Sequence, residues 1–151
     1  SVSATGWDTW FNKKNLAVFA AVGYALPESL ALYPGLEYTF ATWRAGDEVP
    51  LAFGAEVSGI IDFYTGGSAF GVGPAVTARL GLKGLDLPDF LQRFDFCLGV
   101  GLAIMIGAAT PLGVLSHLGF DYFLSDKIAI RLEGTYFGSY GGGAAGVLFK
   151  L

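Results

Sequence analysis

FDFCLGVGLAIMI, residues 94–106, is the stretch that decides the fold. Its even positions carry large apolar side chains, and its odd positions carry mostly small ones. The two sets are Phe94, Phe96, Leu98, Val100, Leu102, Ile104 and Ile106, against Asp95, Cys97, Gly99, Gly101, Ala103 and Met105. Because successive side chains of a β-strand point to opposite faces, this period of two predicts a strand with one fully apolar face.

A transmembrane helix is the competing interpretation of the same region. Residues 96–115 carry no charge and are long enough to cross a bilayer. Glycine and Pro111 are poor helix residues, however, and a helix has no reason to separate large from small side chains by parity. The strand is therefore the favoured prediction.

The composition of the whole chain favours a membrane wall built from strands. The 151 residues are 53% hydrophobic and only 15% charged, whereas an average soluble domain has about 25% charged residues. The 23 glycines and the 15% aromatic content are typical of closely packed strands that carry aromatic residues near their ends. A net charge of -4 without any basic run argues against a nucleic-acid partner.

The same alternation recurs along the chain and predicts about eight strands. Turn-forming residues separate them, and residues 84–92 form the one longer connection, with room for a helical turn. The expected strands are 16–24, 30–42, 50–64, 71–83, 94–106, 112–124, 128–137 and 143–151. Each has about the length that a tilted membrane-spanning strand needs.

On each strand, the face that carries the smaller side chains distinguishes a membrane barrel from a soluble one. In a lipocalin-like barrel the apolar face points inward, and the other face must satisfy water. Here the second face is mainly Gly, Ala, Ser and Thr with one or two charges a strand, which suits a narrow lumen. We therefore predict an all-β fold over residues 16–151, a closed antiparallel transmembrane β-barrel with short connections. A soluble lipocalin-like binding barrel, or an oligomer that hides the apolar face, is the alternative.

The chain resembles, over nearly its whole length, the small eight-stranded outer-membrane barrels of diderm bacteria, the OmpA and OmpX type. The resemblance rests on the strand pattern and not on a signature motif. It implies residence in the outer membrane and contact with membrane lipids. Such barrels commonly end in an aromatic residue that the insertion machinery reads, whereas Phe149 is followed here by Lys150 and Leu151.

Residues 1–15 are predicted to form a separate N-terminal segment. Its aromatic residues stand close to Lys13 and Lys14, and Trp and Lys are typical of a membrane interface. The segment is therefore expected to be either interfacial or a frayed terminus. The aromatic residues expected at the membrane interface are Trp7, Trp10, Trp43, Tyr64, Tyr122 and Tyr136.

Charged side chains at inward positions form the candidate functional site. They are Glu37, Glu56, Arg79, His117, Asp121, Arg131 and Glu133. An eight-stranded barrel is just wide enough to be filled by its own side chains, and unpaired buried charges are costly. We expect these residues to pair and to block the lumen, with a narrow proton or ion path along them as the alternative. In the second strand the inward face is expected to run on from Thr39 to Ala41.

Neither a catalytic nor a metal site is predicted. His117 is the only histidine, and its neighbour Ser116 lies on the opposite face of a regular strand. His117 and Asp121 are too far apart along a strand to chelate one metal ion. The chain lacks the His and Ser motifs of the lipid A deacylases and palmitoyl transferases, and its single cysteine, Cys97, is expected to pack inward. We expect no cofactor.

The short connections leave no large platform for a ligand, since barrels that act as receptors or adhesins carry long loops. We therefore expect a non-enzymatic outer-membrane protein with a structural or envelope-assembly role, acting through membrane lipids or through lateral contact with other envelope proteins. A small pore and a lipid-modifying outer-membrane enzyme are the alternatives.

Overall fold

The computed structural model describes residues 10–25, 29–46, 49–64, 67–106, 111–138 and 140–151. They form a closed barrel in which each strand pairs antiparallel with the next and the last strand pairs with the first. The strands are β1 Leu16–Ala25, β2 Ser29–Ala45, β3 Val49–Tyr64, β4 Gly67–Gly81, β5 Phe94–Ile106, β6 Leu112–Phe123, β7 Ile128–Phe137 and β8 Tyr140–Lys150. The short helix α1, Asp89–Gln92, lies between β4 and β5. The predicted fold class is confirmed.

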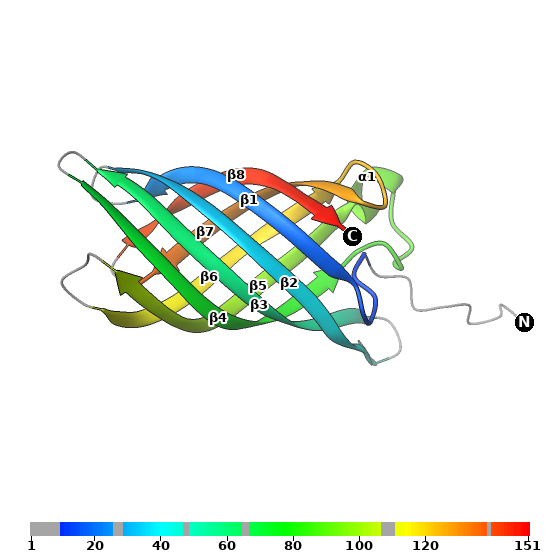
Figure 1. The fold of residues 1–151 in the computed structure, drawn as a ribbon. Helices are drawn as coiled ribbons and strands as arrows, with labels where there is room; N and C mark the ends of the chain where they lie inside the picture. Colours follow the sequence, from blue (N-terminus) through cyan, green and yellow to red (C-terminus); the bar gives the residue numbers. More distant parts are fainter. Residues whose placement is uncertain (1–9, 26–28, 47–48, 65–66, 107–110, 139) are drawn as a thin grey trace, which may run out of the picture.

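The strands cross the barrel at a steep tilt, and α1 and the C-terminus lie at the same end (Figure 1). We call this the α1 end and the opposite one the far end. The transmembrane-helix interpretation of residues 96–115 is wrong, because that stretch forms β5 and the start of β6. No helix in the described part of the chain is long and apolar enough to cross a bilayer.

Three strands extend into segments that the sequence predicts to be turns. β2 continues to Ala45, β4 begins at Gly67, and β8 begins at Tyr140. Before β8 the chain reverses at Gly138, whose φ of 65 lies in the left-handed region that favours glycine. The connections between β2 and β3, between β3 and β4, and between β7 and β8 are therefore shorter than expected.

A β-bulge in β2 changes which residues face the lumen. The pairing of β2 with β3 shifts between Thr39 and Ala41. Beyond this point Ala41 pairs with Phe53 on the apolar outer face, and Trp43 is 60% exposed. The expectation that Ala41 faces inward is wrong, because a bulge adds one residue to a strand and reverses the parity after it.

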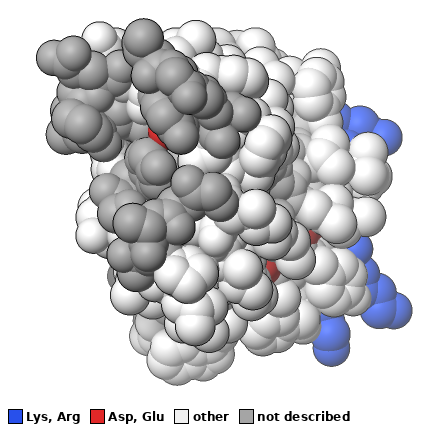
Figure 2. Space-filling view, turned by 60° about the vertical axis from the view of Figure 1, so that its left-hand side comes forward, with Lys and Arg blue, Asp and Glu red and all other residues white. Residues whose placement is uncertain are grey.

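The outer wall of the barrel is apolar. Along β5, exposed and buried side chains alternate, so that Leu102 is 65% exposed while Ala103 is fully buried. Figure 2 shows one face on which the described surface is mostly uncharged, with small areas of Asp or Glu atoms and with lysine and arginine side chains only along one edge. A lipocalin-like barrel would bury these large apolar residues, so that alternative is wrong.

Two clusters of buried apolar residues fill the lumen. We call the cluster at the α1 end the aromatic layer, which consists of Trp10, Phe11, Ala17, Phe19, Ala52, Phe123, Ala129 and Leu148. The cluster toward the far end is the apolar layer, which consists of Ala21, Ala31, Tyr33, Ile60, Ala75, Ala103, Met105, Leu115, Phe137 and Ala144.

Candidate functional site

The charged residues of the lumen lie between the two layers. Along β7, Arg131 and Glu133 follow Ala129 of the aromatic layer and precede Phe137 of the apolar layer. β6 shows the same order in the opposite chain direction. The lumen is therefore divided into an aromatic layer, a charged layer and an apolar layer.

Arg79 is the centre of the charged layer. Its side chain is 1% exposed, and its Nε and Nη2 donate to the two oxygens of Glu37 at 2.8 and 2.6 Å. Its Nη1 donates to Asp95 and to Asp121, both at 2.7 Å. One guanidinium from β4 thus holds carboxylates from β2, β5 and β6, in charge-assisted bonds that are stronger than neutral ones.

Asp121 connects Arg79 to the second buried arginine. Arg131 donates from Nε to Oδ1 of Asp121 at 2.8 Å and from Nη2 to Oδ2 at 3.0 Å. Its Nη1 lies 3.8 Å from Glu133 Oε2, outside hydrogen-bond distance. The ring of Phe19 lies 4.0 Å from the guanidinium carbon, which is a cation–π distance. The aromatic layer is thus in direct contact with the charged layer.

His117 belongs to a second group on the far side of Arg131. Its Nε2 lies 3.1 Å from both carboxylate oxygens of Glu56, and its Nδ1 lies 3.9 Å from Glu133 Oε2. The hydroxyl of Ser58 donates to Glu56 rather than to the imidazole. A nucleophile must be bonded to its base for activation, and Ser58 and His117 are bonded to Glu56 rather than to each other.

The structure brings all seven of the predicted lumen residues into the charged layer, and it shows two further acids buried in the lumen, one in the charged layer and one beyond Ile60 of the apolar layer. The seven are Glu37, Glu56, Arg79, His117, Asp121, Arg131 and Glu133. The two additions are Asp95, bonded to Arg79, and Asp62, which is fully buried nearer the far end. Neither oxygen of Asp62 has a hydrogen-bond partner among the described residues. Both acids have the inward parity of their strands, which is the signal that could have identified them.

The charged layer contains a small cavity. A cavity of about 10 Å³ lies beside His117, between Tyr33 and Phe137, and such a volume holds about one water molecule. Cys97 is buried in the wall opposite Arg79. Among the described residues, no group of three or more His, Cys, Asp or Glu side chains could hold a metal ion.

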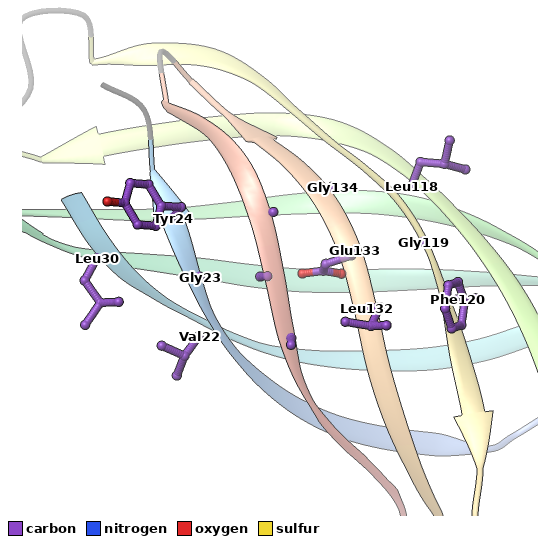
Figure 3. A pocket seen from close by; sticks show the side chains of 13 residues that line it. Val22, Gly23, Tyr24, Leu30, Leu118, Gly119, Phe120, Leu132, Glu133 and Gly134 are labelled. Carbon is purple, nitrogen blue, oxygen red and sulfur yellow. The ribbon is translucent and has the colours of Figure 1, made fainter. Parts of the chain in front are cut away.

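A hollow of about 710 Å³ lies on the outer wall, over β1, β6, β7, β8 and the start of β2. In Figure 3, Val22, Leu30 and Leu132 project outward around it, whereas Glu133 points toward the barrel interior. Its lining residues are Val22, Gly23, Tyr24, Leu30, Leu118, Gly119, Phe120, Leu132, Glu133, Gly134, Gly143, Ala144 and Ala145. This lining contains no serine, cysteine or histidine, so the described residues of the hollow offer no Ser–His or Cys–His pair.

The N-terminal segment enters the barrel at the α1 end. The rings of Trp10 and Phe123 stack at 4.3 Å with an interplanar angle of 1°, and Phe11 meets Phe123 edge-on at 5.8 Å. Trp10 is 6% exposed. Both rings are therefore enclosed in the mouth of the barrel, and an interfacial position of the segment stays a prediction.

The other predicted interfacial aromatics lie in different places. Trp43 and Tyr136 are exposed on the outer wall, and Tyr122 is partly exposed there beside Phe94. Trp7 and the side chain of Tyr64 fall outside the described residues. The depth of these rings in a bilayer stays a prediction.

Comparison with protein-family models and with curated proteins found no match to the chain. Several solved structures have the same architecture. The outer-membrane enzyme PagL is 13% identical with a TM-score of 0.63, over 89% of this chain and 98% of that chain. The N-terminal β-barrel domain of Pseudomonas aeruginosa OprF is 14% identical with a TM-score of 0.59, over 92% and 98%. A de novo designed transmembrane β-barrel is 15% identical with a TM-score of 0.57, over 93% and 98%.

At these identities the likeness concerns the fold and not the activity, since the same fold carries both an enzyme and designed proteins. The chain has the closed, eight-stranded architecture of the small transmembrane β-barrels.

Proposed function

We propose that the chain is an integral outer-membrane protein of a diderm bacterium whose barrel is closed, non-conducting and non-enzymatic. Its interactions are made through the outer wall, with membrane lipids and laterally with other envelope proteins. The observation that carries this proposal is the three-layered lumen, in which Arg79 and Arg131 donate hydrogen bonds to carboxylates from three strands between two apolar layers.

The absence of a catalytic role is supported by the environment of the only histidine. His117 lies in the lumen and is bonded to Glu56, and Ser58 donates to the same carboxylate. A substrate in the membrane would meet the outer wall, where the hollow over β7 and β8 is lined mainly by apolar side chains and glycine, and where Glu133 points toward the barrel interior. This geometry does not resemble a site for acyl transfer.

Three measurements test the proposal. In planar bilayers we expect the purified protein to give no stable, large single-channel conductance, and such a conductance would favour the pore alternative.

Density fractionation of the source envelope should place the protein with the outer membrane, and recovery in the soluble fraction would contradict the membrane assignment. Mass spectrometry of lipid A from expressing cells should show no new species, and a modified lipid would favour the enzyme alternative.

A further inference from the structure

We propose that Trp10 and Phe11 are a stopper that closes the α1 end of the barrel, and that the strands alone leave the charged layer open to water there. This goes beyond the proposed function, because it assigns the closed state at this end to two side chains outside the strands.

The strands themselves do not fill this end of the lumen. Six members of the aromatic layer come from strands, and three of these, Ala17, Ala52 and Ala129, have the smallest of apolar side chains. The apolar layer differs, since its large residues, such as Ile60 and Phe137, all belong to strands. The far end is therefore filled by its own wall, and the α1 end is filled by the N-terminal segment.

Trp10 is held by groups from four separate parts of the chain. Its ring stacks on Phe123, its indole Nε1 donates to the carbonyl oxygen of Gln92 at 2.7 Å, and its own carbonyl accepts from Lys150 Nζ. Lys83 Nζ lies 4.6 Å from the ring centroid. Stacking, an indole hydrogen bond and a cation–π contact together fix the orientation of the ring.

Phe11 is the side chain that separates the charged layer from the mouth. Its ring centroid lies 3.8 Å from the guanidinium carbon of Arg79, and both side chains are buried. Arg79 pairs in register with Cys97 on β5. Removal of the Phe11 ring would therefore uncover Arg79 and, beside it, the only thiol of the chain.

The segment is anchored independently of its rings. The backbone N–H of Lys14 donates to the carbonyl of Thr39 at 2.8 Å, and Thr39 N–H donates to the carbonyl of Asn15 at 2.9 Å. β1 begins only at Leu16 and pairs with both of its neighbours. Substitution of Trp10 and Phe11 should thus leave the strand pairing of the barrel in place.

Access to Cys97 tests the stopper. The full chain, folded in detergent or lipid, is treated with a cationic or an anionic methanethiosulfonate, and the rate of labelling is measured. In the parent protein we expect strong protection from both reagents. In Trp10→Ala with Phe11→Ala we expect labelling to rise by about tenfold or more, as in a local opening. The cationic reagent should react faster than the anionic one, since acids outnumber bases in the charged layer.

Two variants make the result specific. Trp43→Ala removes an exposed ring from β2 near the same end and should leave Cys97 protected. Phe11→Leu keeps an apolar side chain in the mouth and should restore most of the protection that Phe11→Ala loses. Heat-shifted gel mobility and circular dichroism confirm that each variant is folded, and if the double variant does not fold, Phe11→Ala alone is used.

Continued protection of Cys97 in a folded variant that lacks the Phe11 ring would overturn the stopper. Equal labelling by the two reagents would also contradict it, because that result indicates general loosening of the barrel. A parent protein that conducts ions would instead refute the proposed closed state while leaving the effect of Phe11 on thiol access measurable.

Discussion

Asp121 accepts a hydrogen bond from Arg79 at 2.7 Å across the lumen, although β6 and β4 are not neighbours in the barrel. The same carboxylate accepts two bonds from Arg131 on the adjacent strand. Asp121 is thus the one acid that links the two buried guanidinium groups.

The first prediction concerns this link. Asp121→Asn keeps the shape of the side chain but leaves two buried cations without their shared counter-charge. We expect the free energy of unfolding to fall by about 3–5 kcal/mol, the usual cost of removing one partner from a buried ion pair. Asp126→Asn is the control, because Asp126 is 85% exposed and 3.7 Å from Lys83, and such surface pairs contribute less than about 1 kcal/mol. Equal effects of the two changes in urea unfolding would contradict the prediction.

The second prediction concerns the coupling of His117 and Glu56. A double-mutant cycle with Glu56→Gln and His117→Gln should give an interaction energy of about 1–3 kcal/mol, since the two groups are in contact and buried. As the control, the changes in unfolding free energy caused by Glu56→Gln and by Arg93→Gln should add to within about 0.5 kcal/mol, because Arg93 lies outside the lumen network. Additive behaviour of the first pair would show that His117 serves only as packing.

The third prediction follows from the close packing of the His117 ring against Gly99. A Cβ added to Gly99 would lie against the imidazole ring, with Cδ2 and Cε1 both at 2.7 Å. Gly99→Ala should therefore displace His117 and cost about 1–3 kcal/mol by overpacking. His117→Ala in the same chain should relieve much of that cost. Gly134→Ala is the matched control, since its Cβ would meet only a carbonyl oxygen at 3.9 Å, and a loss as large there would reject the steric explanation.

The fourth prediction tests the lipid-facing wall. Val100 is exposed near the middle of β5, and Leu112 is exposed at the start of β6. In lipid vesicles, Val100→Arg should destabilise the barrel by about 2–4 kcal/mol, and Leu112→Arg by no more than about 1 kcal/mol, because the cost of a charge falls toward the membrane surface. Refolding into vesicles followed by denaturant titration measures both values. An unchanged or raised stability of Val100→Arg would indicate a water-facing wall.

Much of the fold could be predicted because the side-chain period of a strand is visible in sequence. The alternation in FDFCLGVGLAIMI and in the other strands indicates which residues face outward. The opposite face carries mainly small side chains and few charges, which indicates a narrow lumen. The inward parity of Arg79 and Asp121 likewise predicts that both side chains lie in the lumen. Parity alone does not say which acid binds which base, because partners come from strands that are not adjacent.

The remaining features depend on contacts that parity does not encode. The bulge at Thr39 and Ala41 reverses the inward face of β2, and no turn residue signals it. Trp10 is typical of an interfacial residue by type, yet the space that it fills is created by Ala17, Ala52 and Ala129 on three different strands. Such a space exists only after the barrel has closed, so a local pattern could not reveal it.

The position of Trp10 therefore has a consequence for the order of folding. Its two hydrogen-bond partners, Gln92 and Lys150, are separated from it by 82 and 140 residues along the chain. β8, which carries Lys150, pairs with β1 in the closed barrel, and we expect contacts of such high sequence separation to form late. The first ring of the described chain is thus among the last groups to reach its place, and its burial marks the completion of the barrel.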